Sequence, residues 1–357
     1  MNMSHIQTFQ VFPAVPEPLS FLQILARNLW WCWRLDAIEL FRRINPRLWE
    51  QSGRNPIVFS TLIPQKQLEK LSKDKSFLAH QQRVKERFVA EILTPVDHSE
   101  TPYGQNGTIA YFSMEYGIHE SVPISAGGLG ILAGDHLKAA SDFALPLIGV
   151  GILYSQGYFH QFLDPDGWQQ EEYPETDIYH LPLKRAKDRS GKDVTVSVEG
   201  PSGEIRAAVW KIMVGRVPLY LLDTNLPENP PHIRDITSRL YAGDTKIRLA
   251  QEVLLGIGGM RCLEAMGIYP LVCHLNEGHC AFATLERLSQ TMSKYNVDLK
   301  TAEEIVSRTT ILTTHTPVAA GHDEFPVDSV KPYLGSLADR LGVSVDEVIS
   351  WGQAVKS

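Results

Sequence analysis

Residues 125–136 read SAGGLGILAGDH and carry glycines at positions 127, 128, 130 and 134. A helix-forming run, LKAASD, follows at once at residues 137–142. Glycine tolerates positive φ angles and has no side chain to keep a ligand away. A helix N-terminus adds unpaired N–H groups and the positive end of a dipole. The stretch therefore predicts a cradle for an anion, most often a phosphate.

The glycine run is a poor match to a dinucleotide-binding fingerprint. Gly128, Gly130 and Ala133 have the required spacing, but the apolar strand expected at 109–112 lies well ahead of the loop instead of directly before it. The lysine of a nucleotide-binding P-loop is also missing from the run. Taken alone, the run is as consistent with a structural turn as with a ligand site.

Short apolar segments and helical segments alternate after residue 107. Strands are expected at 109–112, 147–154, 271–275 and 310–314, a hairpin at 207–214 and 217–222, and helices at 137–144, 233–266 and 281–294. Apolar strands separated by helices predict an α/β fold with a parallel-rich sheet covered on both faces. In such sheets, ligands bind beyond the carboxyl ends of the strands.

Polar residues follow three of these expected strands. Glu115 comes after the first, Glu277 and His279 after the strand at 271–275, and His315 and Thr316 after the strand at 310–314. His279 stands at a strand-to-helix turn, where we expect a hydrogen bond to a sugar hydroxyl. His315 is suited either to contact a bound polyol or to cap its loop.

Two further sites have competing interpretations. His274, Glu277 and His279 do not have the HExxH spacing of a zinc site, so we expect no metal there and interpret His274 as a core residue. Asp244, in the sequence YAGDT at 241–245, is expected to be either a helix N-cap or part of a gate over a cleft.

Residues 1–100 are expected to form a separate helical unit rich in tryptophan. Trp30, Trp31, Trp33 and Trp49 lie close together in the sequence. Aromatic residues at helical spacing favour a packed core over an exposed aromatic binding surface. Proline and glycine crowd residues 94–107, which predicts a linker. Residues 154–173 mix aromatic side chains with glutamines, a composition that fits carbohydrate binding and an exposed hairpin equally well.

The composition narrows the class of protein. A net charge of −7, with 34 spread-out Lys and Arg residues, argues against binding to nucleic acid. The 4 cysteines form no CxxC pair, which favours free thiols in a reducing cytoplasm. We expect no signal peptide at the N-terminus and no membrane span, because no apolar run reaches about 18 residues.

Several segments together resemble one family, the α-glucan (glycogen/maltodextrin) phosphorylases of the bacterial and archaeal type. In chain order they are AYFSMEYGIHES (110–121), SAGGLGILAGDHLKAASD (125–142), GVGILYSQGYFHQ (149–161), YAGDTKIRLAQEVLLGIGG (241–259), HLNEGH (274–279) and TTHTPVAAGHDEFP (313–326). The resemblance covers nearly the whole chain. It implies a GT-B fold, of which residues 101–357 are the N-terminal Rossmann-like half and residues 1–100 a helical extension.

The resemblance also implies a reaction and a set of site residues. The family cleaves α-1,4-glucans with inorganic phosphate to give α-glucose 1-phosphate, and it uses pyridoxal phosphate as a proton donor. Gly127, Gly128 and Leu129 would approach the phosphate and the glucose, with Gly128 also near the cofactor. His315 would contact the glucosyl unit, with Glu277 orienting it and Thr316 also binding substrate. Asp244 would belong to the gate, and Glu115 would line the cleft floor.

Two departures from the family limit what is carried over. The gate of the animal enzymes reads Tyr-Pro-Asn-Asp-Asn, whereas residues 241–245 here are Tyr-Ala-Gly-Asp-Thr. Of the residues in the gate that contact sugar, we therefore assign a role only to Asp244. Family members also continue into a second domain with the Schiff-base lysine, which no segment here resembles. We therefore expect an N-terminal part that is inactive alone and that associates with itself or with a separate C-terminal half. The alternatives are part of a nucleotide-sugar glycosyltransferase of the same fold and a glucan-binding module without catalytic activity.

Overall fold

The computed structural model describes residues 12–99, 107–318 and 323–353 of an α/β protein. Its contacts divide the chain into two compact units. One unit comprises Met1–Thr94 with His180–Pro182, and the other comprises Pro95–Tyr179 with Leu183–Ser357. Of the linker expected at 94–107, residues 95–98 have no regular structure and residues 100–106 lie outside the described part.

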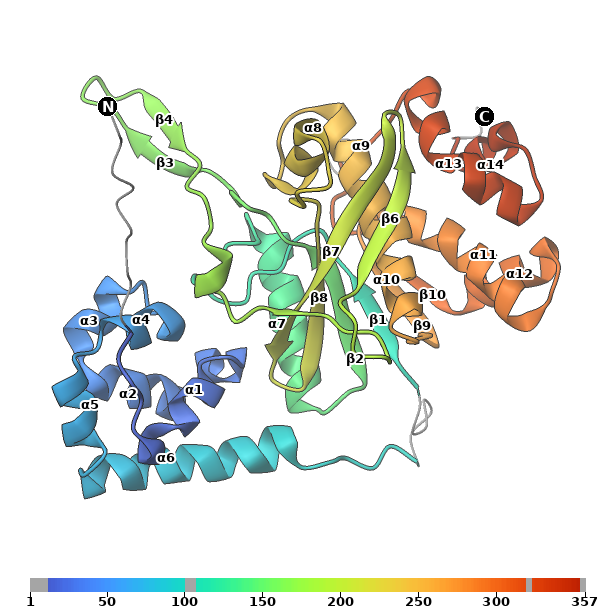
Figure 1. Cartoon of the computed structure of the whole chain (residues 1–357). Coiled ribbons are helices and arrows are strands. Elements are labelled where there is room, and N and C mark those ends of the chain that lie inside the picture. Colours follow the sequence, from blue (N-terminus) through green and yellow to red (C-terminus); the bar gives the residue numbers. More distant parts are fainter. Residues whose placement is uncertain (1–11, 100–106, 319–322, 354–357) are drawn as a thin grey trace, which may run out of the picture. The chain divides into compact units, whose positions relative to one another are not determined.

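The first unit is helical, as the sequence predicted (Figure 1). Side chains of Asn45, Asn55 and Asp74 accept hydrogen bonds from backbone N–H groups in the first turns of α3 (Pro46–Gln51), α4 (Pro56–Leu62) and α6 (Lys75–Phe88) and so cap these helices. The elements are η1 (Glu17–Leu19), α1 (Phe21–Leu25), η2 (Leu29–Trp33), α2 (Leu35–Ile44), α3 (Pro46–Gln51), α4 (Pro56–Leu62), α5 (Gln65–Leu71), α6 (Lys75–Phe88) and the π turn η3 (Val89–Leu93).

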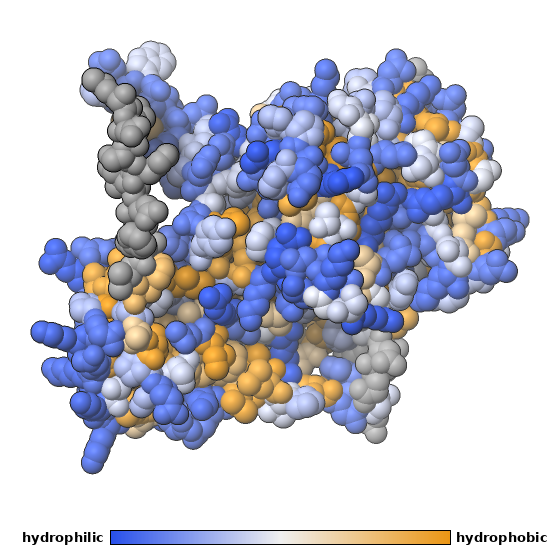
Figure 2. All heavy atoms as spheres, viewed as in Figure 1, coloured by the Kyte–Doolittle hydropathy of each residue, from blue (hydrophilic) through white to orange (hydrophobic). Residues whose placement is uncertain are grey.

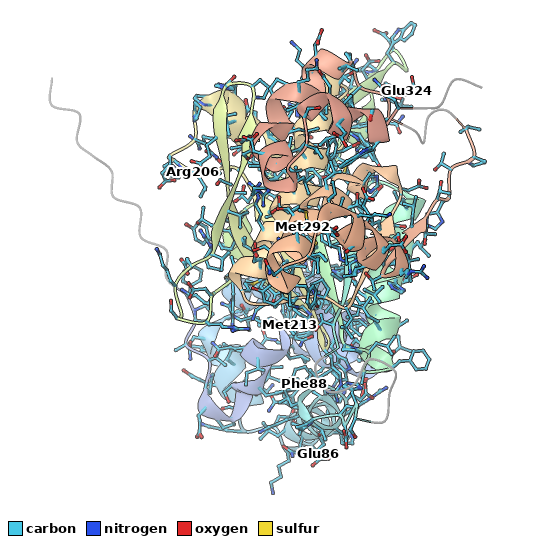
Figure 3. The ribbon with its side chains drawn as sticks, turned by 90° about the vertical axis from the view of Figure 1, so that its right-hand side faces the viewer. Glu86, Phe88, Arg206, Met213, Met292 and Glu324 are labelled. Atoms are coloured by element: carbon cyan, nitrogen blue, oxygen red, sulfur yellow. The ribbon has the colours of Figure 1, made fainter. Side chains whose placement is uncertain are left out.

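Tryptophans form the core of this unit. Trp49 is 1% exposed and stacks on Phe41 with ring centroids 5.5 Å apart. Trp31 meets Trp49 edge to face at 5.8 Å, and Trp30 meets Phe88, labelled in Figure 3, at 5.4 Å. Edge-to-face and offset contacts of this kind are the preferred geometries of buried aromatic rings. The packed-core interpretation is confirmed.

The second unit is built on a mixed, mostly parallel sheet of 8 strands in the order β10-β9-β1-β2-β8-β7-β5, with β6 beside β7. The strands from β10 to β8 run parallel, whereas β7 is antiparallel to β8, β5 and β6. The bounds are β1 (Ile109–Phe112), β2 (Leu147–Ile152), β5 (Lys184–Arg185), β6 (Thr195–Gly200), β7 (Gly203–Val214), β8 (Val217–Asp223), β9 (Val272–Asn276) and β10 (Thr310–Thr313). The expected strands and the β7–β8 hairpin are confirmed.

Helices pack on both faces of this sheet. A Cβ added to Gly149 in β2 would lie 3.4 Å from Leu137 of α7 (Gly128–Asp142), whereas one added to Gly259 of α10 (Gly259–Ala265) would lie 2.8 Å from Val150. Neighbouring residues of β2 therefore face different helices. The helices of this unit are α7 (Gly128–Asp142), η4 (Ile178–His180, divided between the units), α8 (Pro231–Arg234), η5 (Asp235–Thr237), α9 (Thr245–Val253), the π turn η6 (Leu254–Gly258), α10 (Gly259–Ala265), η7 (Gly278–Cys280), α11 (Phe282–Tyr295), α12 (Leu299–Arg308), α13 (Val327–Leu341) and α14 (Val345–Trp351).

Two helix predictions were wrong in their extent. The helix expected to begin at 137 begins at Gly128, so most of the glycine run is helix and not loop. The helix expected at 233–266 is interrupted at residues 238–244 and passes through a π turn at 254–258. Tyr241 and Gly243 in the interruption have positive φ angles of 58° and 74°, which no continuous helix allows.

The segment 154–173 contains an exposed hairpin, β3 (His160–Leu163) and β4 (Gln169–Glu172). This is the structural alternative that the sequence left open.

On the face of the molecule seen in Figure 2, hydrophilic residues predominate, with smaller hydrophobic areas between them.

Cysteines 262, 273 and 280 are buried free thiols, and Cys32 is half-buried. Among the described residues, no helix is both long and apolar enough to cross a membrane. The expectation about a signal peptide falls largely on residues 1–11, which lie outside the described part.

Candidate active site at the carboxyl edge of the sheet

The carboxyl ends of β1, β9 and β10 lie side by side. β1 pairs with β9, and β9 pairs with β10, both in parallel. The chain leaves β1 through α7 to reach β2 on one side, while β9 lies on the other side. The strand order therefore changes direction between β1 and β9, and that is where an α/β sheet opens a crevice. The polar segments predicted to meet beyond these three strands do meet here.

Glu115 is a buried carboxylate that joins three segments. It is 2% exposed. Its Oε2 accepts hydrogen bonds from the backbone N–H groups of Ala126 (2.7 Å) and Gly127 (3.3 Å), and its Oε1 accepts one from the Tyr241 hydroxyl (2.7 Å). The carboxylate therefore lies against the N-terminus of α7, where a negative charge is stabilised by the helix dipole.

The N-terminus of α7 retains two N–H groups beyond those bound by Glu115. Within the described part of the chain, no acceptor is recorded for the N–H groups of Gly128 and Leu129. Gly127 and Gly128 are exposed, and a Cβ on either would meet no atom within 4 Å. The first turn of this helix is therefore open and can accept an anion from outside.

The later glycines of the run serve packing. A Cβ on Gly134 would lie 2.2 Å from the carbonyl oxygen of Gly117, and one on Gly130 would lie 2.7 Å from Glu115 Oε2. None of the four glycines in the run has a positive φ angle. Glycine is needed at 130 and 134 because α7 packs so closely against the segment that follows β1 that a Cβ at either position would clash.

Glu277 caps the end of β10 from a strained backbone. Its Oε1 accepts hydrogen bonds from the N–H groups of His315 (2.6 Å) and Thr316 (3.1 Å) and from the Thr316 hydroxyl (3.3 Å). Its φ of 71° and ψ of 169° lie in a region that is essentially restricted to glycine. A strained residue with a buried carboxylate is typical of a functional site, because the surrounding structure must hold it there.

The ring of His315 is oriented by a buried amide. Its Nε2 lies 2.9 Å from Asn276 Oδ1, and Asn276 Nδ2 donates to the Ser113 hydroxyl at 3.2 Å. That hydroxyl donates in turn to the Glu115 carbonyl at 2.9 Å. An amide oxygen only accepts, so Nε2 of His315 carries the proton and Nδ1 remains available to a ligand. His315 itself is exposed.

His279 is buried beside the end of β1, and its predicted hydrogen bond to a sugar hydroxyl stays a prediction. It is 6% exposed, and its Nε2 accepts a hydrogen bond from the Met114 N–H at 3.2 Å. Burial lowers the pKa of His279 to about 3, and the nearby Arg248 cation acts in the same direction. The ring is therefore neutral and supports the end of β1.

Asp244 is exposed and acts as the N-cap of α9. Its carboxylate accepts a hydrogen bond from the Lys246 N–H at 2.7 Å. The cap interpretation is confirmed in structure, and the gate role stays a prediction. The same turn carries Tyr241, whose hydroxyl binds Glu115, so the turn and the end of β1 are directly linked.

The sequence did not single out Asn276, Tyr241 or Arg248. Asn276 and Tyr241 lie within segments that the sequence had marked, at a strand end and in the YAGDT turn. Arg248 lies one helical turn after Asp244, and that spacing was the available signal. His274 is half-buried and bonded to the Thr313 hydroxyl at 2.7 Å. Over residues 12–99, 107–318 and 323–353, no group of three or more His, Cys, Asp or Glu could hold a metal ion.

Comparison with known proteins adds to this geometry. A family model described as a protein of unknown function (DUF3417) matches residues 15–122. Glycogen phosphorylase of Mycobacterium tuberculosis is 40% identical over 98% of this chain, which covers 43% of that protein. Maltodextrin phosphorylase of Thermococcus litoralis is 41% identical over 96% of this chain and 41% of its own length. Glycogen phosphorylase of Aquifex aeolicus is 38% identical over 92% and 46% respectively. The chain thus spans less than half the length of these relatives.

Proposed function

We propose that this chain, which belongs to the α-glucan phosphorylase family, forms the glucan-binding side of an enzyme that cleaves α-1,4-glucans with inorganic phosphate. The product is α-glucose 1-phosphate. The observation that carries the proposal is 40% identity to a glycogen phosphorylase over 98% of the chain. The polar cluster at the carboxyl edge lies in the segments on which the resemblance to the family rests.

In this proposal the second unit is the N-terminal Rossmann-like half of a GT-B fold. We assign residues 101–357 to it and residues 1–100 to a helical extension. A GT-B enzyme works across a cleft between two such halves, and the crevice at β1 and β9 would be one wall. The other wall belongs to the part of the relatives that this chain does not span.

The glucosyl unit at the site of cleavage would bind between His315 and the turn that carries Asp244. Asn276 fixes the ring of His315, and Glu277 fixes the backbone of residues 315 and 316. His315 can then present Nδ1 and its carbonyl to sugar hydroxyls without reorganising on binding. A group held in place before the substrate arrives contributes more to catalysis than one that must be ordered.

The phosphate side of the reaction would use the N-terminus of α7. The open N–H groups of Gly128 and Leu129 fit a phosphate oxygen, and the missing side chains at 127 and 128 allow close approach. These features also fit the phosphate of pyridoxal phosphate, which supplies a proton donor in the family. Glu115 adds negative charge beside this position, so we expect the cations that balance the phosphate, and the Schiff-base lysine, to come from the opposite wall.

Inorganic phosphate and an α-1,4-glucan are thus the proposed substrates. We place the enzyme in a reducing compartment, the cytoplasm, because its buried cysteines are free thiols.

The decisive test measures α-glucose 1-phosphate released from maltodextrin and inorganic phosphate by the protein that carries this chain. We expect release with pyridoxal phosphate bound and none when phosphate is omitted. Residues 1–357 alone should give none, since a single wall lacks most of the charge stabilisation. Transfer of glucose from a nucleotide sugar, without phosphorolysis, would identify a glycosyltransferase of similar fold instead. Maltodextrin binding without either reaction would identify a binding module.

A further inference from the structure

Arg248 is the charged centre of a cluster that the proposed reaction does not use. It lies in the first turn of α9, and its side chain is 16% exposed. Its Nε donates to Glu252 Oε1 at 2.9 Å and to Asp323 Oδ2 at 3.1 Å, and its Nη2 donates to the same Asp323 oxygen at 2.9 Å. One guanidinium therefore holds the carboxyl groups of two residues from different segments.

The same guanidinium reaches two more segments of the candidate site. The guanidinium carbon Cζ lies 5.5 Å from the ring centroid of Tyr241, within the range of a cation–π contact. Its Nη1 contacts the sulfur of Met114, directly before Glu115. Arg248 thus touches the turn before α9, the segment after β1 and, through Asp323, the segment that precedes α13. Glu324, labelled in Figure 3, is the next residue of that last segment.

We propose that Arg248 is a positioning residue that holds these three segments in one arrangement, so that Glu115, the 241–244 turn and the backbone at Asp323 form a single glucan-binding surface. Arg248 need not touch the glucan itself. The identity of the ligand rests on the proposed function, but the positioning of the three segments does not.

The charge balance of the cluster makes this arrangement depend on pH. Burial raises the pKa of Glu252 to about 8, against the pull of Arg248 and with the help of a hydrogen bond to Asp323. Although its own partial burial acts in the opposite direction, the hydrogen bond from Glu252 and the Arg248 cation lower the pKa of Asp323. Below pH 8 the cluster therefore carries one positive and one negative charge. Above pH 8 a second negative charge appears beside the first.

Among the described groups around it, Glu252 is the one that titrates in this range. His279 is neutral there, because its pKa is lowered to about 3 by burial. The Cys280 thiol is also neutral, because burial raises its pKa well above the ordinary value. Arg248 stays charged, and Asp323 stays ionised. We therefore expect the segment with Asp323 to loosen as the pH rises through about 8.

The test uses hydrogen–deuterium exchange, corrected for the intrinsic rate at each pH, on the chain and on Arg248→Met and Arg248→Lys variants. In Arg248→Met, peptides that contain Tyr241 and Asp323 should exchange faster, while β1 and β9 stay protected. Arg248→Lys keeps the charge but lacks the guanidinium that bonds to Glu252 and Asp323 at once, so it should restore part of the protection. Maltodextrin affinity, measured by calorimetry, should weaken about tenfold in Arg248→Met and less in Arg248→Lys.

Arg340→Met is the matched control. Arg340 of α13 also pairs with a buried carboxylate, that of Glu286 in α11, outside the Arg248 cluster. Its loss should raise exchange in α13 and leave peptides with Tyr241 unchanged. A third variant, Glu252→Gln, should abolish the rise in exchange at Asp323 between pH 7 and 9 that the unmodified chain shows.

The outcomes separate the two proposals. Unchanged exchange at Tyr241 and Asp323 in Arg248→Met, or equal effects of Arg248→Met and Arg340→Met on those peptides, would overturn the positioning role. A chain that shows the expected exchange but binds no maltodextrin would support the positioning role and contradict the proposed ligand. A pH profile unaffected by Glu252→Gln would overturn the role of Glu252 in the pH dependence.

Discussion

Glu277 adopts a backbone conformation that is ordinarily restricted to glycine. Its carboxylate is also the acceptor for two backbone N–H groups, those of His315 and Thr316. These two demands can be separated by substitution. Glu277→Ala keeps the strain and leaves the N–H groups of His315 and Thr316 without their acceptor, at a cost of about 1–3 kcal/mol. Glu277→Gly loses the same acceptor but relieves strain of about 1–3 kcal/mol.

We therefore predict that the glycine variant is more stable than the alanine variant, although glycine usually destabilises relative to alanine. The free energy of unfolding from urea denaturation checks this order. An alanine variant as stable as the glycine variant would show that the backbone at 277 is not strained.

Glu252 leads to a prediction about stability and pH. Its pKa is about 8 in the folded chain and about 4.5 when exposed, so between these values the folded state holds a proton that the unfolded state has released. Stability must then fall as the pH rises through this range. The lowered pKa values of His80, His136, His274 and His279 act in the opposite direction, and their effect fades as the pH rises past about 6.5.

Comparing the unmodified chain with Glu252→Gln therefore isolates Glu252, because both share the same histidines. We predict that from pH 6.5 to 8 the free energy of unfolding of the unmodified chain falls relative to that of Glu252→Gln by at most about 2 kcal/mol. Denaturant titrations at several pH values measure both. A variant with the slope of the unmodified chain would assign the pH dependence to another group.

At the residue scale, the sequence could indicate which residues gather but not where each side chain points. Glu115, Glu277 and His315 meet as predicted because parallel strands bring their carboxyl ends to one edge. His279 follows the same rule and yet turns inward, because its ring accepts the N–H of Met114, a residue 165 positions earlier. Such long-range pairing leaves no local pattern in the sequence.

The element that decides the site is α7, whose start the sequence misplaced. A run with glycines at 127, 128, 130 and 134 favours loop by propensity, since glycine is a poor helix former. Packing overrides propensity here because only a helix without side chains at 130 and 134 can approach the segment after β1 so closely. The strands were easier to predict, because buried parallel strands read as continuous apolar runs.

Two glycines of α7 form a matched pair for an experiment. In Gly134→Ala the new Cβ would lie 2.2 Å from the Gly117 carbonyl oxygen, so the helix must shift. We predict a loss of about 1–3 kcal/mol, the usual range for overpacking. Gly128→Ala meets no atom within 4 Å and should change stability by less than about 1 kcal/mol, in the stabilising direction.

Thermal and urea denaturation of both variants test the pair. If the N-terminus of α7 accepts phosphate as proposed, Gly128→Ala should also weaken phosphate binding while keeping the fold. Equal stabilities of the two variants would contradict the packing role of Gly134.

At the scale of the whole molecule, the sequence separated a tryptophan-rich helical part from an α/β part, and the contacts divide the chain at Thr94. The division could be predicted because the two parts have different sequence patterns. Aromatic residues at helical spacing come before it, and apolar strands that alternate with helices come after it. The sequence indicated the helix start at Asp244 but not the interruption before it, since the positive φ angles at Tyr241 and Gly243 are maintained by contacts such as that with Glu115.

The last prediction concerns the edge of the sheet at β10. This strand ends the strand order, and Ile311 and Leu312, which point to opposite faces, are 52% and 58% exposed. An apolar edge strand offers unpaired N–H and C=O groups to a second chain. We predict that the 357-residue polypeptide self-associates at high concentration and that Leu312→Lys reduces this, since a charged edge resists pairing. Phe143→Lys, at an exposed position after α7, is the control and should leave association unchanged. Light scattering over a range of concentrations measures the effect, and a monomer at every concentration, or equal behaviour of the two variants, would show that the β10 edge does not mediate contact.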